Sequence, residues 1–490
     1  MTMKLFNSLT RKLEIFSPIQ PPKVGVYTCG PTVYDYVTIG NWRTYVFGDL
    51  VVRTLKYLDY RPEYVMNITD VGHLTGDNLG DADTGEDRLE KAAKRENRTA
   101  WDIADFYTRD FFMGYKTLNL TKPKIFCKAT DHIKEQIELI QKIEKKGFVY
   151  KITDGIYFDT RAYEASGNKY GQLSNIDQVK AGARVEPNPE KKDPRDFALW
   201  KFSPKGTKRQ MEWGSPWGIG FPGWHIECSA MAMKYLDEQF DIHIGGEDLR
   251  STHHPNEIAQ AEAGTGKKPF VKYWLHGAFL KVDDGRMGKS LGNAYRLSDI
   301  EKKGYQTNHL RYFYLTGHWR QPLNFTWENL ETAKKSYENL TSIIKQFKIA
   351  KANPTDKKSW KKLESWETKF RNNLENDLNM PKVLAVVWEM VRSEIPAGKK
   401  LALLFKWDKI LGLDLNRSYE LRVKIYKGKV SKVRIESEVE LNPAIISLID
   451  KREIARQKKQ WQQADLIRSQ LEKKGYQIED NQKQMLIREM

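Results

Sequence analysis

Two cysteines, one histidine and one glutamate carry side chains that could bind a metal ion together. His253 and Glu257 are four residues apart. A helix that begins here would present both on one face, because Pro255 is acceptable in a first helical turn. With the thiols of Cys29 and Cys228 they make a donor set of sulfur, nitrogen and oxygen that suits tetrahedral Zn²⁺. Neither cysteine belongs to a CxxC pair, so the alternative is that both are small apolar core side chains.

A second group of residues could hold a nucleotide. The glycines of Gly245–Asp248 allow close backbone approach, and the Asp248 carboxylate could accept hydrogen bonds from ribose hydroxyls. The loop Arg286–Asn293 carries two cations, Arg286 and Lys289, which could close over a triphosphate and stabilise charge developing on pyrophosphate. Each pattern also has an ordinary explanation, a surface turn for the first and a solvated loop for the second.

These groups depend on a strand, a turn and a helix near the start of the chain. Val24–Tyr27 is a short apolar run that predicts a buried strand, and helical periodicity begins at about Asn41. Thr38–Asn41 then lies at the helix N-terminus, where unpaired N–H groups and the helix dipole favour a phosphate. Glu63–Thr69 is typical of a second strand, so a parallel βαβ unit is expected. Cys29 would lie at the carboxyl end of its first strand, where open α/β sheets bind ligands.

The middle of the chain alternates between helices, strands and loops. Residues 72–90 predict a solvated acidic loop, because their aspartates do not fit the spacing of a calcium-binding EF-hand. A shift to glycine, proline and charge at 167–220 indicates an insertion. Further predicted elements are helices at 101–118, at 131–146 and after 253, and apolar strands or stretches at 155–160, 240–244 and 271–280.

Beyond about residue 310 helical periodicity dominates. Met380 and Pro381 are expected to open one helix, since proline is tolerated in a first turn. Residues 419–438 alternate apolar and polar side chains around a Lys-Gly pair, which predicts a small exposed hairpin. Pro443 is then expected to open a basic helical tail.

Length and composition restrict the class of protein. With 490 residues the chain is expected to form two to four domains. Neither a membrane span nor a secretory signal is expected, and Cys29, Cys127 and Cys228 are too few for a disulfide framework, which predicts a reducing cytoplasm. Cys127 is expected to be a buried apolar side chain. A net charge of +17, with 14 Trp and 23 Tyr, suits a polyanion such as nucleic acid, although an enzyme that is merely basic is the alternative.

Taken in order, these segments resemble one family, cysteinyl-tRNA synthetase, a class I aminoacyl-tRNA synthetase. The resemblance covers about residues 5–315, is weaker through the helical region and returns in the tail. So long an ordered match is far more specific than any one of its motifs. The segments that carry it are CGPTVYDYVTIGN at 29–41, PGWHIECSAMAM at 222–233, DIHIGGEDLRSTHHPNEIAQ at 241–260, GRMGKSLGN at 285–293 and RQKKQWQQADLIRSQLEKKGYQIED at 456–480.

The resemblance implies a role for residues in most of these segments. One zinc ion would be held by Cys29, Cys228, His253 and Glu257. The substrate cysteine would lie beside Gly30, Thr69 and Trp224. ATP, supplied with Mg²⁺, would be bound by Thr38, Ile39, Gly40, Asn41, Gly246, Asp248 and Lys289, and the catalytic residues would be Asn41, Arg286 and Lys289.

A zinc ion would also explain how cysteine is distinguished from serine. A pocket that relies on shape rejects a near-isostere only about 100-fold. A thiolate, in contrast, is a far better zinc ligand than a hydroxyl. No editing domain would then be needed.

Two segments depart from the family pattern. TIGN lacks both histidines of the HIGH signature, although Asn41 can still donate an amide hydrogen bond to phosphate. In RMGKS, which corresponds to the KMSKS signature, Gly288 replaces a hydroxyl and loosens the loop. Both changes concern the rate of adenylate formation more than the identity of the enzyme. The hairpin at 419–438 also differs from what the resemblance implies.

The sequence therefore predicts an α/β protein with three parts. A Rossmann-type parallel-sheet catalytic domain at 1–310, with an insertion at about 120–220, is followed by a helical bundle at 311–416 and a basic anticodon-contacting module at 417–490. The expected activity is activation of L-cysteine with ATP and transfer of the cysteinyl group to the 3′ adenosine of tRNA(Cys), by a cytoplasmic monomer.

Two other functions stay open at this point. A ligase that passes the same adenylate to an amino sugar would share the catalytic segments but would lack the tRNA-binding tail. A zinc-stabilised RNA-binding paralogue without catalysis is compatible with the TIGN variation. Cysteine-dependent exchange of pyrophosphate into ATP, followed by charging of tRNA, distinguishes the three.

Overall fold

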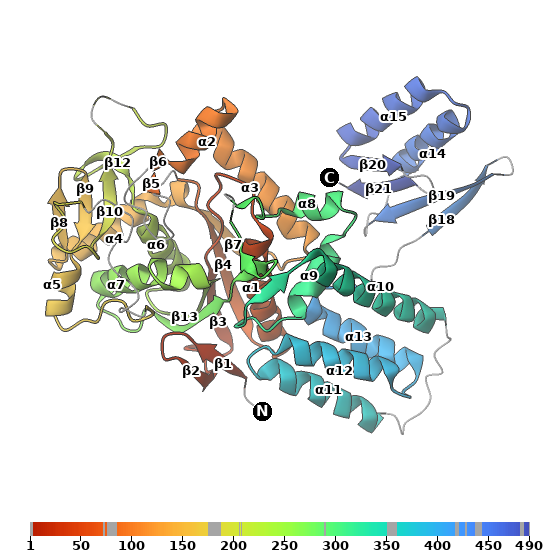
Figure 1. The fold of residues 1–490 in the computed structure, drawn as a ribbon, viewed down its shortest axis with the longest axis horizontal. Coiled ribbons are helices and arrows are strands. Elements are labelled where there is room, and N and C mark those ends of the chain that lie inside the picture. Colours follow the sequence, from red (N-terminus) through yellow and green to blue (C-terminus); the bar gives the residue numbers. More distant parts are fainter. Residues whose placement is uncertain are drawn as a thin grey trace. The chain divides into compact units, whose positions relative to one another are not determined.

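The structure is a computed structural model that divides into two compact units, Met1–Leu413 and Asp414–Met490 (Figure 1). It describes residues 3–71, 74–75, 86–174, 188–204, 206, 208–288, 291–349, 360–416, 421–426, 429–436, 443–480 and 485–489. The predicted domain boundaries near residues 310 and 416 remain predictions. Among the described helices, none combines the length and the apolar character that a membrane span requires.

A parallel sheet lies at the centre of the first unit. Within the described residues its strand order is β14-β13-β3-β4-β7, and every neighbouring pair is parallel. In chain order this is the 3-2-1-4-5 arrangement of a Rossmann-type sheet, with the switch point between β3 and β13. The predicted fold class is therefore confirmed. The strands are β3 (Lys23–Thr28), β4 (Arg61–Ile68), β7 (Ile125–Lys128), β13 (Phe240–Gly246) and β14 (Val271–Gly277).

The predicted βαβ unit is confirmed as β3, α1 (Ile39–Tyr57) and β4. The helix begins at Ile39, slightly earlier than about Asn41, with Thr38 as its extended N-cap residue. Its apolar face is buried as the periodicity indicates, and Val51 and Leu55 are fully enclosed. This packing fixes the N-terminus of α1 at the carboxyl edge of the sheet.

The insertion folds as a second sheet, which is antiparallel. Its order in the described residues is β11-β12-β10-β9-β8, and the yellow strands at the left of Figure 1 show it as a separate layer. The predicted strand at 155–160 ends at Phe158, because Asp159 caps the short helix α5 (Thr160–Ala165) that follows. The strands are β8 (Val149–Ile152), β9 (Gly155–Phe158), β10 (Phe197–Phe202), β11 (Trp213–Ser215) and β12 (Gly218–Pro222).

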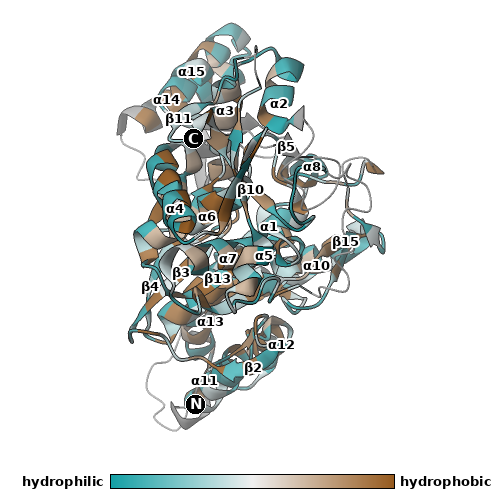
Figure 2. Cartoon of the chain, turned by 90° about the vertical axis from the view of Figure 1, so that its left-hand side faces the viewer, coloured by the Kyte–Doolittle hydropathy of each residue, from teal (hydrophilic) through white to brown (hydrophobic). Residues whose placement is uncertain are grey.

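Helix α6 (Trp224–Leu236) joins the two sheets through the core. Its Cys228 and Met231 pack in the cluster on the parallel sheet, whereas Ile226 and Ala230 pack in the cluster under the insertion. Figure 2 accordingly shows brown, hydrophobic residues along α6. Because both of its faces are buried, the helix has little freedom to shift.

The segment 72–90 is only partly the predicted loop. Most of it lies outside the described residues, but β5 (Leu74–Thr75) pairs with β6 (Glu86–Asp87), and α2 (Arg88–Glu96) begins inside the segment. The carboxylate of Asp87 accepts hydrogen bonds from the backbone N–H groups of Leu89 and Glu90, which is typical of an N-cap. Asp87 is therefore the N-cap residue of a helix, and its assignment to the acidic loop is wrong.

The other helices predicted in the first part of the chain are confirmed with small shifts. They are α3 (Ala100–Thr117), α4 (Ile133–Lys145) after the 3₁₀ turn η1 (Ala129–His132), and α7 (His253–Thr265) after the 3₁₀ turn η3 (Glu247–Arg250). Additional elements are β1 (Lys4–Asn7), β2 (Lys12–Ile15), β15 (Leu280–Val282), β16 (Gly285–Arg286), β17 (Leu323–Phe325), α8 (Leu297–Lys302) and α9 (Thr307–Leu315).

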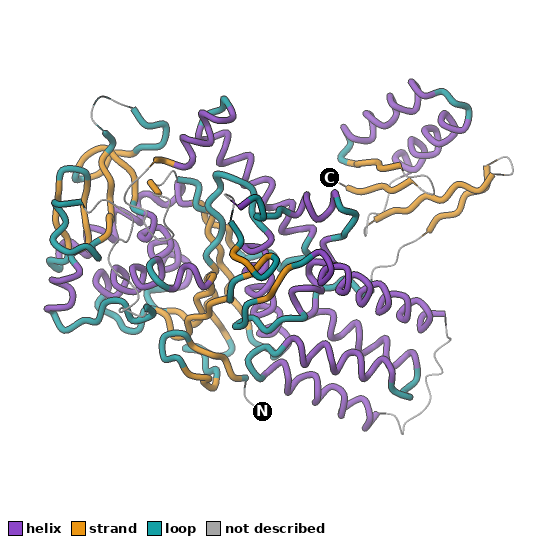
Figure 3. The backbone as a smooth tube through the Cα atoms, viewed as in Figure 1, coloured by secondary structure: helices purple, strands orange, loops and turns teal. Residues whose placement is uncertain are grey.

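Long helices follow, as predicted, and Figure 3 shows them as neighbouring purple tubes. The helix expected at Met380 is confirmed, with Pro381 in its first turn and the Asn379 side chain accepting a hydrogen bond from Lys382 N. The helices are α10 (Trp327–Ile349), α11 (Trp360–Glu375), α12 (Met380–Arg392) and α13 (Ala397–Leu411).

The second unit combines helices with a small sheet. The hairpin predicted at 419–438 is confirmed as the antiparallel pair β18 (Leu421–Tyr426) and β19 (Lys429–Glu436), although its side chains lie outside the description. The predicted helical tail is only partly right. After α14 (Pro443–Gln457) and α15 (Trp461–Lys473), the chain returns as β20 (Tyr476–Asp480) and β21 (Met485–Glu489). β21 pairs with β19, a partner distant in sequence that local periodicity does not reveal.

A buried ion pair ties α9 to α1. Arg311 Nη2 lies 2.6 Å from Asp49 Oδ2, and both side chains are fully buried. Arg311 also donates hydrogen bonds from Nη1 to Leu118 O and from Nε to Leu411 O, so each nitrogen of its guanidinium has an acceptor. Although burial opposes it, Arg311 and Arg53 keep the pKa of Asp49 below its usual value.

We expect Arg311→Met to lower the free energy of unfolding by about 3 to 5 kcal/mol, because it removes the fully buried partner of the Asp49 carboxylate and leaves only the partly exposed Arg53. Urea unfolding of the first unit measures the change. Arg109→Met is the control, since the Arg109–Asp105 pair is exposed and should contribute at most about 1 kcal/mol. Similar losses in the two variants would show that the buried pair has no special role.

Candidate metal centre and nucleotide site

The predicted metal ligands come from separate elements and meet in one place. Cys29 follows β3, Cys228 lies within α6, and His253 and Glu257 occupy the first turns of α7. Their ligand atoms all lie within 4.8 Å of one another. The two Sγ atoms are 3.9 Å apart, and His253 Nε2 is 3.0 Å from Glu257 Oε1. These separations are compatible with tetrahedral coordination of one ion.

Burial makes this cluster electrostatically demanding. All four side chains are buried, and Glu257 Oε2 has no hydrogen-bond partner among the described residues. Burial raises the pKa of the Glu257 carboxyl and of the Cys29 thiol, whereas a hydrogen bond from Cys29 lowers the pKa of Cys228. A cation at the centre would satisfy the free carboxylate oxygen and offset the charge of the thiolates. The residues present therefore fit a zinc ion.

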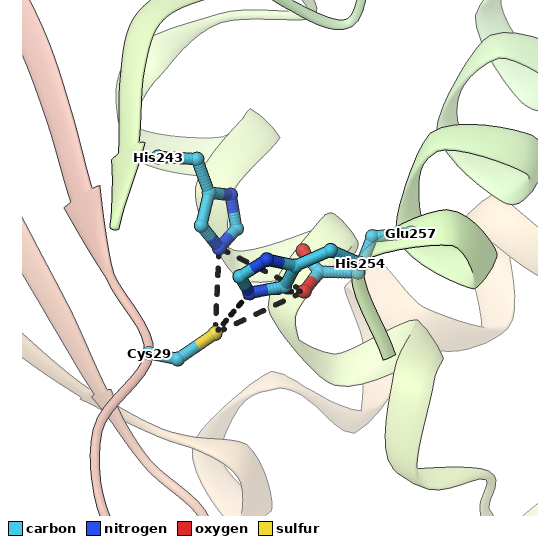
Figure 4. Close-up of side chains that lie close together, drawn as sticks. All are labelled: Cys29, His243, His254 and Glu257. Carbon is cyan, nitrogen blue, oxygen red and sulfur yellow. Dashed lines mark hydrogen bonds and ion pairs between the residues drawn. The ribbon is translucent and has the colours of Figure 1, made fainter. Parts of the chain in front are cut away.

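Two histidines that sequence reasoning missed surround the same thiol. Figure 4 shows His243 and His254 pointing at Cys29 and Glu257. Their Nε2 atoms lie 3.3 and 3.5 Å from Cys29 Sγ, and 3.7 and 3.9 Å from Glu257 Oε1. Burial lowers the pKa of both imidazoles, so both are neutral. The sequence offers a signal for His254, which directly follows His253, but His243 lies in the apolar segment IHI and resembles a core residue there.

His243 and His254 form, with Cys29 and Glu257, an alternative donor set of similar size. The set that contains His253 fits zinc better. A ligating imidazole normally donates its other N–H, but His243 Nδ1 is buried and has no partner in the described part of the chain. His253 Nδ1, in contrast, lies 3.0 Å from His225 Nδ1. His243 is therefore better placed to donate Nε2–H to the Cys29 sulfur.

The fold brings these residues together at the switch point of the sheet. Cys29 follows β3, and His243 lies in the adjacent β13. Gly245 has a specific reason to be glycine, because a Cβ there would lie 2.5 Å from Cε1 of His254. The other ring nitrogen of His254, Nδ1, forms a hydrogen bond of 2.7 Å with His276 Nε2, which fixes the orientation of the ring.

The residues expected beside the substrate cysteine lie next to this cluster. The ring of Trp224 is 4.4 Å from that of His253. Gly30 donates its N–H to Asn67 Oδ1, and a Cβ on Gly30 would overlap the Asn67 carbonyl. Asn67 in turn donates to Thr69 Oγ1 at 3.0 Å. Thr69 is thus oriented by a buried amide that the sequence did not single out.

Thr38 and Asn41 face each other at the start of α1. Thr38 Oγ1 donates to Asn41 Oδ1 at 2.8 Å, so the Asn41 NH₂ group remains a donor. The expectation of unpaired amides needs a correction at Ile39, whose N–H donates to Tyr295 O at 2.9 Å. A Cβ on Gly40 would lie 3.3 Å from Met287, so the TIGN and RMGKS segments are neighbours.

The predicted cationic loop is only partly described. Arg286 is exposed in β16, and Lys289 lies outside the described residues. Asn293 fixes the loop from within, because Oδ1 accepts from Gly288 N and Nδ2 donates to Arg286 O. Asp248 lies in η3 beyond β13, and its carboxylate occupies the space that a Cβ on Gly246 would need.

Comparison with known proteins identifies the family. The model of the class I (C) tRNA synthetase catalytic domain matches residues 15–335, and the model of the cysteinyl-tRNA ligase anticodon binding domain matches residues 438–488. The chain is 42% identical to cysteine–tRNA ligase of Treponema denticola, over 98% of each chain. The chain belongs to the cysteine–tRNA ligase family. Cysteine–tRNA ligase 1 of Burkholderia lata is also 42% identical, over 98% of this chain and 95% of the relative.

Solved structures support the fold of this ligase. Methionyl-tRNA synthetase of Mycobacterium tuberculosis, in complex with methionyl-adenylate, superposes with a TM-score of 0.54 at 14% identity, covering 79% of this chain and 89% of that one. At this identity the likeness shows the class I fold alone. The family, the fold class and the ligase activity predicted from the sequence are confirmed.

Proposed function

We propose that this ligase selects L-cysteine at a zinc centre formed by Cys29, Cys228, His253 and Glu257, and activates it with ATP. The observation that carries the proposal is the convergence of these ligand atoms within 4.8 Å of one another. A bound cation is also favoured by the buried thiols and by Glu257 Oε2, which has no hydrogen-bond partner in the described part of the chain. When bound there, Zn²⁺ would accept the thiolate of cysteine as a ligand and would not accept the hydroxyl of serine in its place.

Protein side chains would orient the amino acid around that centre. Trp224 stands beside His253 and would form one wall of the pocket. Thr69 Oγ1 also lies 3.2 Å from Glu227 Oε2, so its hydroxyl is fixed from two sides. Gly30 would present its backbone beside the substrate after β3, and the Asn67 carbonyl leaves no room for a side chain at this position.

ATP would lie between α1 and the RMGKS loop. Thr38 to Asn41 would approach the phosphates at the helix N-terminus, with Asn41 Nδ2 as donor. Gly246 and Asp248 would meet the ribose, and Arg286 and Lys289 would stabilise the charge that develops on pyrophosphate. We assign no general base, because positioning and charge stabilisation account for adenylate formation in outline.

The second unit would contact the anticodon region of tRNA(Cys). Residues 438–488 match a domain described by that role, and the chain carries a net charge of +17, which suits a polyanion. This match disfavours an amino-sugar acceptor, for which no such domain is needed. All three cysteines are free and buried, in keeping with the proposed reducing cytoplasm. We further propose that the enzyme acts as a monomer and that it binds ATP together with Mg²⁺.

Two assays test the function. Cysteine-dependent exchange of pyrophosphate into ATP should be present, which separates the enzyme from a non-catalytic RNA-binding paralogue. Charging of tRNA with cysteine should follow, which separates it from an amino-sugar ligase. Exchange without charging, or no exchange at all, would contradict the proposal.

We expect Cys228→Ser to lower zinc content and to weaken cysteine binding together, by at least about tenfold, because one ligand of the shared ion is replaced by a poor one. Metal analysis and calorimetric titration with cysteine measure both quantities. Cys127→Ser is the matched control, since Cys127 is a buried free cysteine whose Sγ lies 3.5 Å from Met66 O, outside the cluster. It should retain its zinc.

We expect Lys289→Ala to slow ATP–pyrophosphate exchange roughly 100-fold with little change in cysteine affinity, because it removes a cation needed only as charge develops on pyrophosphate. Lys281→Ala, in the exposed part of β15, is the control and should keep the parental rate. If the Cys228 and Lys289 variants changed exchange and cysteine affinity to the same extent, the proposed division of roles would fail.

A further inference from the structure

Arg43 is a buried cation that joins three segments through backbone carbonyls. Its Nη1 donates to Ala278 O and Phe279 O, each at 2.7 Å. Its Nη2 donates to His318 O at 3.1 Å and to Gln321 O at 2.6 Å. The side chain of Arg43 is only 5% exposed, so the guanidinium is enclosed by these acceptors.

The carbonyls bound by Arg43 belong to one hydrogen-bonded layer. Ala278 N donates to Trp319 O at 2.8 Å, and Leu323 N donates to Phe279 O at 3.3 Å. Strand β15 starts directly after Phe279 and pairs with β17 on one side and with β16 on the other. Since β16 carries Arg286, this layer is the base of the RMGKS loop.

On its other side, Arg43 belongs to the first turns of α1. It follows Asn41 by two residues, within the same rigid helix as the TIGN segment. The Tyr314 hydroxyl donates to Ile39 O at 2.6 Å and holds the same helix end. The TIGN and RMGKS segments touch where Met287 approaches Gly40. The spacing of the two segments therefore depends on how α1 is attached to the layer that contains β15.

We infer that Arg43 is a positioning residue for ATP, which sets the RMGKS loop against the N-terminus of α1 without touching the nucleotide. The inference rests on the proposed ATP site and adds the element that holds its two halves in register. A planar guanidinium suits this task, because its fork of N–H donors can reach two segments at once. A lysine ammonium keeps the charge but is a single point that cannot span both pairs of carbonyls.

The test compares Arg43→Lys with Arg311→Lys, the same substitution at a second buried arginine, which is bonded to the Asp49 side chain in the middle of α1. In cysteine-dependent pyrophosphate exchange, Arg43→Lys should lower kcat/KM for ATP about 10- to 100-fold, since small misplacements of reacting groups have effects of this size. Calorimetric affinity for cysteine should stay unchanged. Arg311→Lys should lower the thermal midpoint and leave kcat/KM for ATP unaltered.

A second variant covers the case in which Arg43→Lys fails to fold. Trp319 stacks on Phe47, with ring centroids 4.4 Å apart, and thereby supports the loop that supplies the His318 and Gln321 carbonyls. Trp319→Leu should reproduce the loss of kcat/KM for ATP with cysteine affinity retained. Amide hydrogen exchange should become faster at 278–282 and 285–288 in either variant.

The inference is overturned if both variants keep the parental kcat/KM for ATP, if cysteine affinity falls in parallel, or if Arg311→Lys shows the same loss. These results differ from a failure of the proposed function. An unmodified chain without cysteine-dependent exchange would contradict the ATP site itself. Normal exchange in the unmodified chain together with unaffected variants would contradict the role of Arg43 alone.

Discussion

The structure depends on one electrostatic constraint, the burial of two thiols and a carboxylate around a common point. Glu257 leaves one oxygen without a hydrogen-bond partner among the described residues, and burial keeps the neighbouring His243 and His254 neutral. Such a cluster is costly unless a cation is bound. The same arrangement would make the proposed pocket selective, because a bound metal ion would favour a further soft ligand.

The Rossmann-type sheet satisfies this constraint by bringing distant residues to one edge. β3 and β13 are neighbours on either side of the switch point, so Cys29 and His243 meet although 214 positions separate them. α6 and α7 then supply Cys228, His253 and Glu257 from the helical layer. The nucleotide segments start from the same edge, which places the proposed amino-acid and ATP sites next to each other.

The sequence could predict most of this architecture because its signals are local. Apolar periodicity located β3, α1 and α12, and the four-residue spacing of His253 and Glu257 placed them on one helix. It could not reveal His243, because a histidine inside a buried strand looks like any core residue until the fold brings a thiol to it. The strands β20 and β21 were missed since their partner lies elsewhere in the chain. The hydrogen bond from Ile39 N to Tyr295 O could not be predicted either, because its acceptor is also distant in the sequence.

The central claim is that two thiols, an imidazole and a carboxylate share one ion that also receives the substrate sulfur. X-ray absorption at the zinc edge of the purified, zinc-loaded chain tests this directly. The account predicts two sulfur neighbours without amino acid, three after addition of cysteine, and still two after addition of serine. A zinc shell without sulfur, or one that cysteine leaves unchanged, would contradict it.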